Sequence, residues 1–360
     1  MMKFKLPNDD VSQRLLATPS WVSQYLDIRI ASQNAREESE YFLNKQAKNT
    51  SETASKVRGC LLGLALGDAL GTTLEFSERD QFPLVTHIVG GGPFRLNAGE
   101  WTDDSSMALC LAHSLLRTNG FNAADQMDLY TRWWQEGLFS VNGTCFDIGN
   151  TVISALHKYA QTQQPFSGST HSASAGNGSL MRLAPAALYY LNDPQECIDA
   201  CGASSRTTHQ AAECVDACRY FGGLLLGAIK GATKDELTQS VYEPYPGAWK
   251  TQTLEPEVIR VATQAHLKTR DKVSSTGYVI HTLEAALWAF ANSRSFEEGA
   301  VLAVNLAGDA DTVGAVYGQL AGAFYGDYNL DPTWIKKLAL PSIFYAYADE
   351  ILQENTTKNT

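Results

Sequence analysis

The sequence has no excess of positive charge and no long uninterrupted apolar run. Its 28 lysine and arginine residues are outnumbered by 39 aspartate and glutamate residues, which gives a formal net charge of −11. This balance argues against broad nucleic-acid binding, which relies on a positive surface, but it is compatible with a nucleotide whose phosphates meet backbone N–H groups or metal ions. The first ten residues lack the apolar core of a signal peptide, and no apolar span is long enough to cross a bilayer. We therefore expect a cytoplasmic protein with no nucleic-acid or membrane partner.

The tight cysteine pairs that are typical of structural zinc sites are also missing. The seven cysteines lie in apolar helical patterns, and Cys197 with Cys201 and Cys214 with Cys218 have i, i+4 spacing. Four such thiolates could form a zinc site across two helices. Structural zinc sites use tighter spacing, so the pattern favours buried, reduced core thiols.

Patterns typical of β-strands are scarce. Residues 82–89 have the composition of a short extended segment, and the glycines that follow interrupt it. From Lys56 to about residue 352 the pattern is helical, and 44% hydrophobic content is enough for a large core. We predict one all-α domain over residues 56–352 and a frayed tail over residues 353–360.

Glycine, by contrast, is abundant and regularly placed. A glycine inside a helix costs about 1 kcal/mol relative to alanine, so its repetition on one helix face needs a packing reason. Glycines four residues apart occur in three segments: Gly59, Gly63, Gly67 and Gly71; Gly223, Gly227 and Gly231; and Gly314, Gly318, Gly322 and Gly326. These stripes predict close helix crossings in the core.

Residues 1–55 differ in composition from the rest of the chain. Ser20 can cap a helix that carries Trp21 and later aromatic residues, and the polar stretch 46–55 has the character of a linker. Two interpretations stay open. The segment is either an additional helix packed on the domain or a partner-binding arm whose aromatic side chains are tethered to the core.

Two acidic clusters stand out in the predicted domain. In the first, Asp309 and Asp311 precede Thr312, which we expect to begin a helix, and no lysine or arginine lies nearby in the sequence. A buried carboxylate must be paired, bind a metal ion or stay neutral. A surface helix N-cap explains the segment equally well when it is taken alone.

The second cluster repeats this arrangement. Thr102, Asp103 and Asp104 precede an amphipathic helix that we expect to begin near Ser105, and taken alone they form a good capping sequence. Together the two clusters provide up to four carboxylates and two hydroxyl groups. These oxygen ligands suit a pair of divalent ions about 3.5–4 Å apart, and magnesium or manganese fits them better than zinc.

Three further segments add polar groups to such a site. Glu75 follows the helix that ends in Gly67-Asp-Ala-Leu-Gly71, and Asp147 lies beside a turn at Gly149. The segment Gly176-Asn-Gly-Ser179 can present backbone N–H groups to a phosphate. A lone Gly-x-Gly is weak evidence, because it is most often an ordinary turn.

Taken together, these motifs resemble the ADP-ribosylglycohydrolase family over about Arg58 to Tyr325. The resemblance rests on six ordered motifs: Gly67-Asp-Ala-Leu-Gly71, Thr102-Asp-Asp-Ser105, Asp147-Ile-Gly149, Gly176-Asn-Gly-Ser179 with Arg182, Thr276-Gly-Tyr-Val279 and Asp309-Ala-Asp-Thr312. It implies a compact orthogonal all-α bundle with a binuclear site for two Mg²⁺ ions, or Mn²⁺. The metal ligands that it implies are Thr102, Asp103, Asp104, Asp309, Asp311 and Thr312.

The resemblance also implies roles for the remaining residues. Glu75 would be a mobile ligand or an acid–base group, Asp147 with Gly149 would face the ribose, and Tyr278 would lie on the adenine side. The diphosphate would meet the loop of Gly176, Asn177, Gly178 and Ser179. As a hypothesis, Asp104 positions substrate and nucleophile with the metal ions, and either Glu75 or Asp147 transfers the proton.

The function that follows is metal-dependent removal of ADP-ribose from a modified protein, with an arginine linkage favoured over a serine or ester linkage. The alternative is an immunity protein that binds and occludes an ADP-ribosyltransferase toxin through residues 1–55. A structural, inactive descendant of the family would show broken acidic clusters, and both clusters are intact in this sequence.

Overall fold

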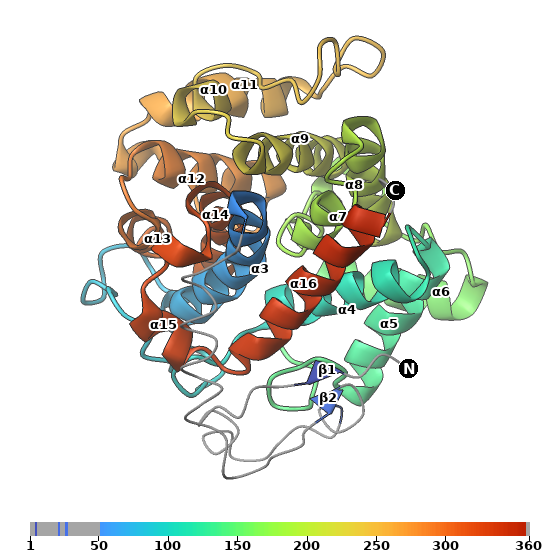
Figure 1. Cartoon of the computed structure of the whole chain (residues 1–360). Coiled ribbons are helices and arrows are strands. Elements are labelled where there is room, and N and C mark those ends of the chain that lie inside the picture. Colours follow the sequence, from blue (N-terminus) through green and yellow to red (C-terminus); the bar gives the residue numbers. More distant parts are fainter. Residues whose placement is uncertain (1–3, 6–20, 22–25, 28–50, 358–360) are drawn as a thin grey trace.

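The computed structural model describes residues 51–357 together with Phe4, Lys5, Trp21, Leu26 and Asp27 (Figure 1). Helices joined by loops make up the described domain, which confirms the predicted all-α class. The α-helices are α3 (Glu52–Gly71), α4 (Asp103–Arg117), α5 (Ala123–Glu136), α6 (Asn150–Thr162), α7 (Ala184–Tyr189), α8 (Pro194–Thr208), α9 (Ala212–Ile229), α10 (Lys234–Thr238), α11 (Pro256–Gln264), α12 (Val279–Ala291), α13 (Phe296–Val304), α14 (Ala310–Tyr325), α15 (Pro332–Lys337) and α16 (Pro341–Thr357). Short 3-10 turns are η1 (Thr72–Leu74), η2 (Ser172–Ser174), η3 (Ala265–Leu267), η4 (Arg270–Lys272) and η5 (Asp327–Asn329).

Helices α3 and α14 lie side by side at the centre of the domain and run in opposite directions (Figure 1). Their glycine stripes face each other. A Cβ atom added to Gly63 would overlap the carbonyl oxygen of Gly318, and one added to Gly67 would overlap that of Gly314. The predicted close crossing is confirmed for these two stripes, because the two backbones approach to a distance that leaves no room for side chains.

The third glycine stripe has a different role. A Cβ atom on Gly227 would lie 2.6 Å from the ring of Tyr242, and one on Gly223 would lie 3.2 Å from Pro244, so these residues accommodate a loop. Gly231 lies beyond the end of α9, has φ +91°, and faces open space. The predicted helix crossing is therefore wrong for this stripe, because a loop and not a helix covers the face.

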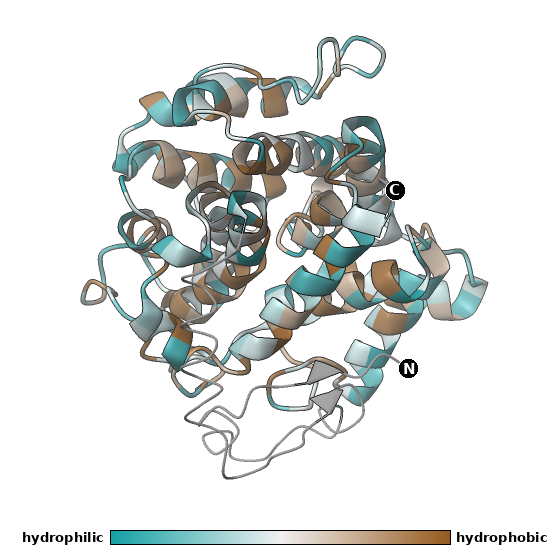
Figure 2. Ribbon diagram, viewed as in Figure 1, coloured by the Kyte–Doolittle hydropathy of each residue, from teal (hydrophilic) through white to brown (hydrophobic). Residues whose placement is uncertain are grey.

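Helix α3 with the turn that follows it is long and apolar enough to span a membrane by composition. However, 89% of its most apolar window is buried inside the domain. Figure 2 shows hydrophobic residues along α3, where α14 and the neighbouring helices cover it. The helix is the core element of the domain.

Both predicted boundaries of the domain need correction. Helix α3 begins at Glu52 and not at Lys56, because the Ser51 side chain accepts a hydrogen bond from the Ala54 N–H and the Ser55 hydroxyl donates to Asp327. At the other end, α16 continues to Thr357. Buried Asn355 donates to the Leu188 carbonyl, so the predicted frayed tail is wrong over residues 353–357, and residues 358–360 lie outside the described part.

Trp21, in the N-terminal segment, contacts the domain. Trp21 is only 4% exposed, its indole N–H donates to the Ser140 carbonyl at 2.7 Å, and its ring meets Phe139 edge-on. Phe4–Lys5 (β1) pairs in parallel with Leu26–Asp27 (β2), so the predicted helix is wrong at Leu26–Asp27. The other residues of that prediction lie outside the described part. The contact of Trp21 does not decide between the two interpretations of the segment, an additional helix or a partner-binding arm.

Residues 82–89 are irregular and form no strand. The backbone N–H and carbonyl of Val85 both bond to the side-chain amide of Asn305. One amide thus satisfies the two backbone groups of Val85, which a partner strand would otherwise bind.

Candidate active site

The carboxyl-terminal end of α3 meets the amino-terminal ends of α4 and α14. A Cβ atom on Gly71 would lie 2.5 Å from the Asp311 Cα, so the glycine crossing brings the start of α14 against the end of α3. Both α4 and α14 begin two residues earlier than predicted, at Asp103 and Ala310. The acids therefore lie in the first helical turns, where the helix dipole favours negative charge.

Asp68, on α3, connects the first of these helices to the core. Its two carboxylate oxygens accept hydrogen bonds from the Thr102 N–H and hydroxyl, both at 2.9 Å, and from the Ser105 N–H and hydroxyl, at 3.1 and 2.6 Å. Asp68 is not among the residues predicted for the site. The available signal was an aspartate in an otherwise apolar, glycine-striped helix, where a charge requires a buried partner.

The two acidic clusters that the sequence places about 200 residues apart come together in the structure. The Thr102 hydroxyl oxygen lies 3.2 Å from Asp311 Oδ2 and 3.3 Å from Asp104 Oδ2. The Thr312 hydroxyl lies 3.4 Å from the same Asp104 oxygen. The predicted cluster residues thus surround one small volume, which the N-cap interpretation of either segment alone does not require.

Glu75 and Asp147 reach the same volume from loops. One carboxylate oxygen from each of Glu75, Asp147 and Asp311 lies within 4.8 Å of the others. The Phe76 N–H bonds to the Gly308 carbonyl at 2.6 Å, which holds Glu75 beside the Asp309 segment. Asp147 has φ +59°, a left-handed backbone conformation that is uncommon for a residue other than glycine.

Burial and mutual repulsion raise the pKa values of these acids. Burial, followed by the charges of Asp311, Asp147 and Asp309, raises the pKa of Glu75 to about 12. Burial, followed by the charge of Asp311 and a hydrogen bond with it, raises the pKa of Asp147 to about 10. Burial with the charge of Asp311 raises the pKa of Asp309 to about 7. Burial also raises the pKa values of Asp103 and Asp104 well above the usual range.

The arrangement fits a hard divalent cation. Among the described residues, no lysine or arginine forms an ion pair with Glu75, Asp147 or the cluster acids. Asp104 Oδ1 and Glu75 Oε2 are buried and accept no hydrogen bond. Buried carboxylate oxygens without a cationic side chain are the ligands that magnesium and manganese prefer, so the donor set suits these ions.

The predicted phosphate loop is fixed next to the acids. The Asn177 N–H bonds to the Gly277 carbonyl at 3.0 Å, and its side-chain amide donates to Asp309 Oδ2 and to the Thr282 hydroxyl, both at 2.8 Å. Gly176 pairs with Tyr278 in an antiparallel bridge. The buried Ser179 hydroxyl bonds instead to Ser205, so only the backbone of Ser179 is available to a ligand.

Two of the cysteines form hydrogen bonds with this loop. The Cys214 thiol donates to the Gly176 carbonyl at 3.3 Å, and the Cys218 thiol lies 3.5 Å from the Ser179 hydroxyl. Burial raises the pKa of both thiols. They are core thiols, as predicted. Among the described residues, one group of potential ligand side chains lies close enough together to hold a metal ion, and it consists of Glu75, Asp147 and Asp311. The cysteines form no such group there, so a zinc site has no support.

The remaining predicted substrate residues border the loop. Tyr278 is half-buried, donates from its hydroxyl to Glu213 at 2.8 Å, and packs edge-on against His281. Gly149 is exposed and caps the start of α6, where an added Cβ atom would meet nothing within 4 Å. The structure therefore places every predicted site residue in one region of the domain.

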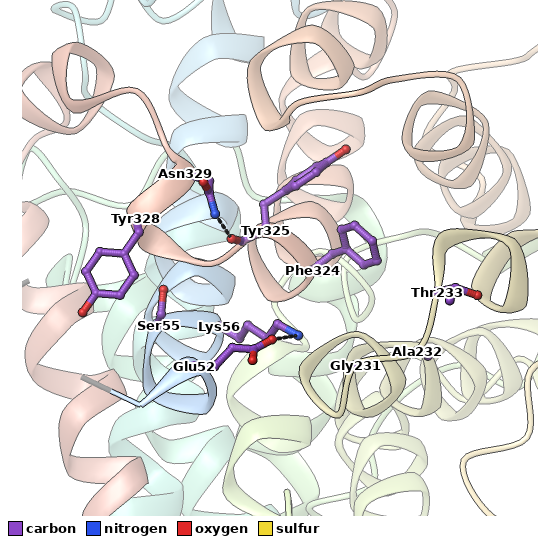
Figure 3. A pocket seen from close by; sticks show the side chains of 10 residues that line it. All are labelled: Glu52, Ser55, Lys56, Gly231, Ala232, Thr233, Phe324, Tyr325, Tyr328 and Asn329. Carbon is purple, nitrogen blue, oxygen red and sulfur yellow. Dashed lines mark hydrogen bonds and ion pairs between the residues drawn. The ribbon is translucent and has the colours of Figure 1, made fainter. Parts of the chain in front are cut away.

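A separate cavity of about 710 Å³ lies at the opposite end of the α3–α14 pair (Figure 3). It lies between the start of α3 and the end of α14, and its lining includes Phe324, Tyr325 and the ion pair of Lys56 with Glu52. No carboxylate of the cluster lines it. The cavity does not belong to the candidate active site.

The fold and the site define an all-helical enzyme domain with a carboxylate-rich centre next to a glycine loop. The family model described as ADP-ribosylglycohydrolase matches residues 49–360, and the chain belongs to the ADP-ribosylglycohydrolase family. It is an ADP-ribosyl hydrolase by class.

Several named proteins are similar to this chain. It is 43% identical to "ADP-ribosylarginine hydrolase Tri1" of Pseudomonas putida (strain GB-1), over 83% of this chain and 78% of that protein. It is 30% identical to "ADP-ribosyl-[dinitrogen reductase] glycohydrolase" of Rhodospirillum rubrum, over 78% of this chain and 89% of that protein. A solved structure, "ADP-ribosylglycohydrolase-related protein complex", superposes with a TM-score of 0.74 and 43% identity, covering 84% of this chain and 99% of that one.

Proposed function

We propose that this protein hydrolyses the N-glycosidic bond between ADP-ribose and an arginine side chain of a modified protein in the cytoplasm. The observation that carries the proposal is the close approach of Glu75, Asp147 and Asp311 beside a loop that Asn177 ties to Asp309. The arginine linkage is supported by two relatives, 43% and 41% identical, that are named ADP-ribosylarginine hydrolase.

The loop and the acids bind different parts of the substrate. The loop of Gly176 to Ser179 meets the diphosphate through the N–H groups of Gly178 and Ser179, because those of Gly176 and Asn177 already bond to backbone carbonyls. The ring of Tyr278 lies along the adenine, and Asp147 accepts a hydrogen bond from a ribose hydroxyl. The glycines permit this close approach of a ligand to the backbone. Such binding places the anomeric carbon over the acidic cluster.

The reaction replaces the C1″–N bond with a C1″–O bond from water. As the C–N bond lengthens, positive charge develops on the ribose, and the surrounding carboxylates stabilise it. Glu75 or Asp147, whose pKa values are raised by burial and by the neighbouring carboxylates, donates a proton to the departing guanidine nitrogen. Asp104 orients the attacking water, and the water's proton passes to an ionised carboxylate of the cluster. The products are ADP-ribose and unmodified arginine.

Two divalent cations, magnesium or manganese, held by Thr102, Asp103, Asp104, Asp309, Asp311 and Thr312, would hold the ribose hydroxyls and acidify the attacking water. The unpartnered Asp104 oxygen supports this assignment. The crowding of the acids supports it as well, because cations offset repulsion that no basic side chain relieves.

The direct test is release of free ADP-ribose from an arginine-ADP-ribosylated protein, with and without magnesium. We expect metal-dependent release by the wild-type protein and a loss of at least about 100-fold in Asp311→Ala, within the range for removal of a group that acts on the transition state. Asp199→Ala, at an exposed position of α8, is the matched control. Release from a serine-linked substrate but not from an arginine-linked one would overturn the arginine assignment.

A second candidate function concerns the N-terminal segment, which we propose binds and occludes an ADP-ribosyltransferase toxin. The supporting observation is that Trp21 packs on Phe139 and Ser140, in the loop that continues to Asp147. A variant lacking residues 1–20, which keeps the Trp21 contact with the domain, should keep hydrolase activity but fail to inhibit the toxin, whereas Asp311→Ala should still inhibit it. Full inhibition by the truncated variant would refute this role.

A further inference from the structure

Exposed apolar side chains concentrate on the segment that follows Glu75. Four of the eight large hydrophobic residues that are exposed in the described chain lie between residues 76 and 89. They are Phe76, Phe82, Leu84 and Val89, with exposed fractions of 68%, 55%, 67% and 58%. Such a concentration on one surface segment marks an interaction site more often than scattered single residues do.

This segment is firmly anchored to the domain. The Arg79 guanidinium donates to the carbonyls of Leu306 at 3.0 Å and Val273 at 2.7 Å. Val85 is buried and bonded on both sides to Asn305, and Ile88 is buried as well. The inward-facing residues hold the segment in place, so the exposed ones contribute little to the fold and remain free for contact with another molecule.

A row of aromatic rings connects this surface to the active site. Phe76 directly follows Glu75 and has φ +57°, a conformation that is uncommon for a bulky residue. Its ring meets Phe94 edge-on at 6.5 Å, and Phe94 meets Phe146 at 5.3 Å. Phe146 directly precedes Asp147. The apolar surface therefore starts at the two loop carboxylates and extends away from them.

The occupant follows from this position. On the proposed function, the ADP-ribose half of the substrate is held by the Gly176 loop and Tyr278. The arginine that departs from the anomeric carbon remains part of a polypeptide, which must pass the edge of the acidic cluster. The ring row of Phe76, Phe94 and Phe146 forms part of that edge, and the chain continues from Phe76 to the exposed Phe82 and Leu84.

We propose that the surface formed by Phe76, Phe82, Leu84 and Val89 binds the polypeptide that carries the ADP-ribosylated arginine. This inference rests on the proposed function and deepens it. Apolar residues that flank the modified arginine pack on this surface, which gives the enzyme affinity for modified proteins beyond its affinity for the ADP-ribosyl group.

The test compares two substrates, an ADP-ribosylated protein and free ADP-ribosyl-arginine, with the full-length enzyme. The double variant Phe82→Ser/Leu84→Ser removes two exposed apolar side chains of this surface. Neither residue is adjacent in the sequence to a carboxylate of the candidate active site. We expect its kcat/KM to fall about tenfold or more for the protein substrate, as for truncation of interface anchors, and to stay within about twofold for ADP-ribosyl-arginine. Ile259→Ser, an exposed position on α11, is the control that should change neither value.

The other outcomes overturn the proposal. An equal fall for both substrates would show that the surface serves the ADP-ribosyl group or the fold, and thermal unfolding would separate these two. No fall for either substrate would remove the substrate polypeptide as occupant, and sedimentation of the wild type and the double variant would then show whether a second copy covers the surface. A wild-type protein that cleaves neither substrate would refute the proposed function and this inference together.

Discussion

Gly71 and Asp311 lie so close together that a Cβ atom added to Gly71 would come 2.5 Å from the Asp311 Cα atom. The relationship joins the fold to the site, because the glycine contact of α3 with α14 also positions an acid of the cluster. Substitutions along this contact should therefore affect stability and activity together.

Gly71→Ala should destabilise the protein by about 1–3 kcal/mol or more, because the added methyl group overlaps backbone atoms that cannot move aside. It should also lower the rate of ADP-ribose release by shifting Asp311. Chemical denaturation and the release assay measure the two effects. Gly149→Ala is the control for stability, since its added Cβ would meet nothing within 4 Å. Unchanged stability in Gly71→Ala would contradict the close crossing.

Asp68→Asn should reduce activity about 10–100-fold, the usual effect of losing a residue that orients the groups around a metal site. The amide can accept from Thr102 or from Ser105 but cannot serve all four donors that the carboxylate now satisfies. The magnesium concentration that gives half-maximal ADP-ribose release should be higher for Asp68→Asn than for the wild type. Asp199→Asn provides the matched exposed control, and wild-type magnesium dependence in Asp68→Asn would argue against a positioning role.

The metal-free protein should lose stability as the pH rises through 7. The folded-state pKa of Asp309 is about 7, above its usual value of 3.8, because of burial and the charge of Asp311. The folded state therefore binds this proton more tightly than the unfolded state. The resulting stabilisation is complete below pH 3.8 and disappears as the pH passes through the folded value.

Thermal unfolding in a chelator, scanned from below pH 6 to above pH 7, measures this effect. Asp68, whose pKa is raised to about 6 by burial, contributes in the same direction. Asp309→Asn should show a shallower decline than the wild type. Added magnesium should raise the melting temperature most at the upper end of the range, because ligand binding to the folded state stabilises it. If the melting temperature of the wild type in the chelator increased with pH, and that of Asp309→Asn did not, this prediction would be wrong.

Trp21→Ala should destabilise the protein by about 3–5 kcal/mol, the usual cost of truncating a buried tryptophan. Trp21→Phe retains most of the ring contact with Phe139 and loses the hydrogen bond to Ser140, so it should cost about 1 kcal/mol. Thermal or denaturant unfolding distinguishes the two variants. Equal stability of Trp21→Ala and the wild type would mean that this contact is not maintained in solution.

The helical class, the close crossing of the α3 and α14 segments and the acids of the candidate site were predictable from the amino-acid sequence. Each of these is a local pattern. Glycines four residues apart mark one helix face, and acids just before a helical segment mark its amino-terminal end. The cysteines of α9 were also correctly predicted as core thiols, but their hydrogen bonds to the glycine loop were not predictable from spacing.

Which of these patterns come together in space depends on how the helices pack. Asp104 and Asp311 are neighbours because α3 and α14 pack without intervening side chains, and Asp68 belongs to the site because α4 begins beside it. Within the irregular segment 82–89, an asparagine 220 residues away satisfies the backbone N–H and carbonyl of Val85. Such contacts depend on distances across the core, which packing sets and which no local sequence pattern records.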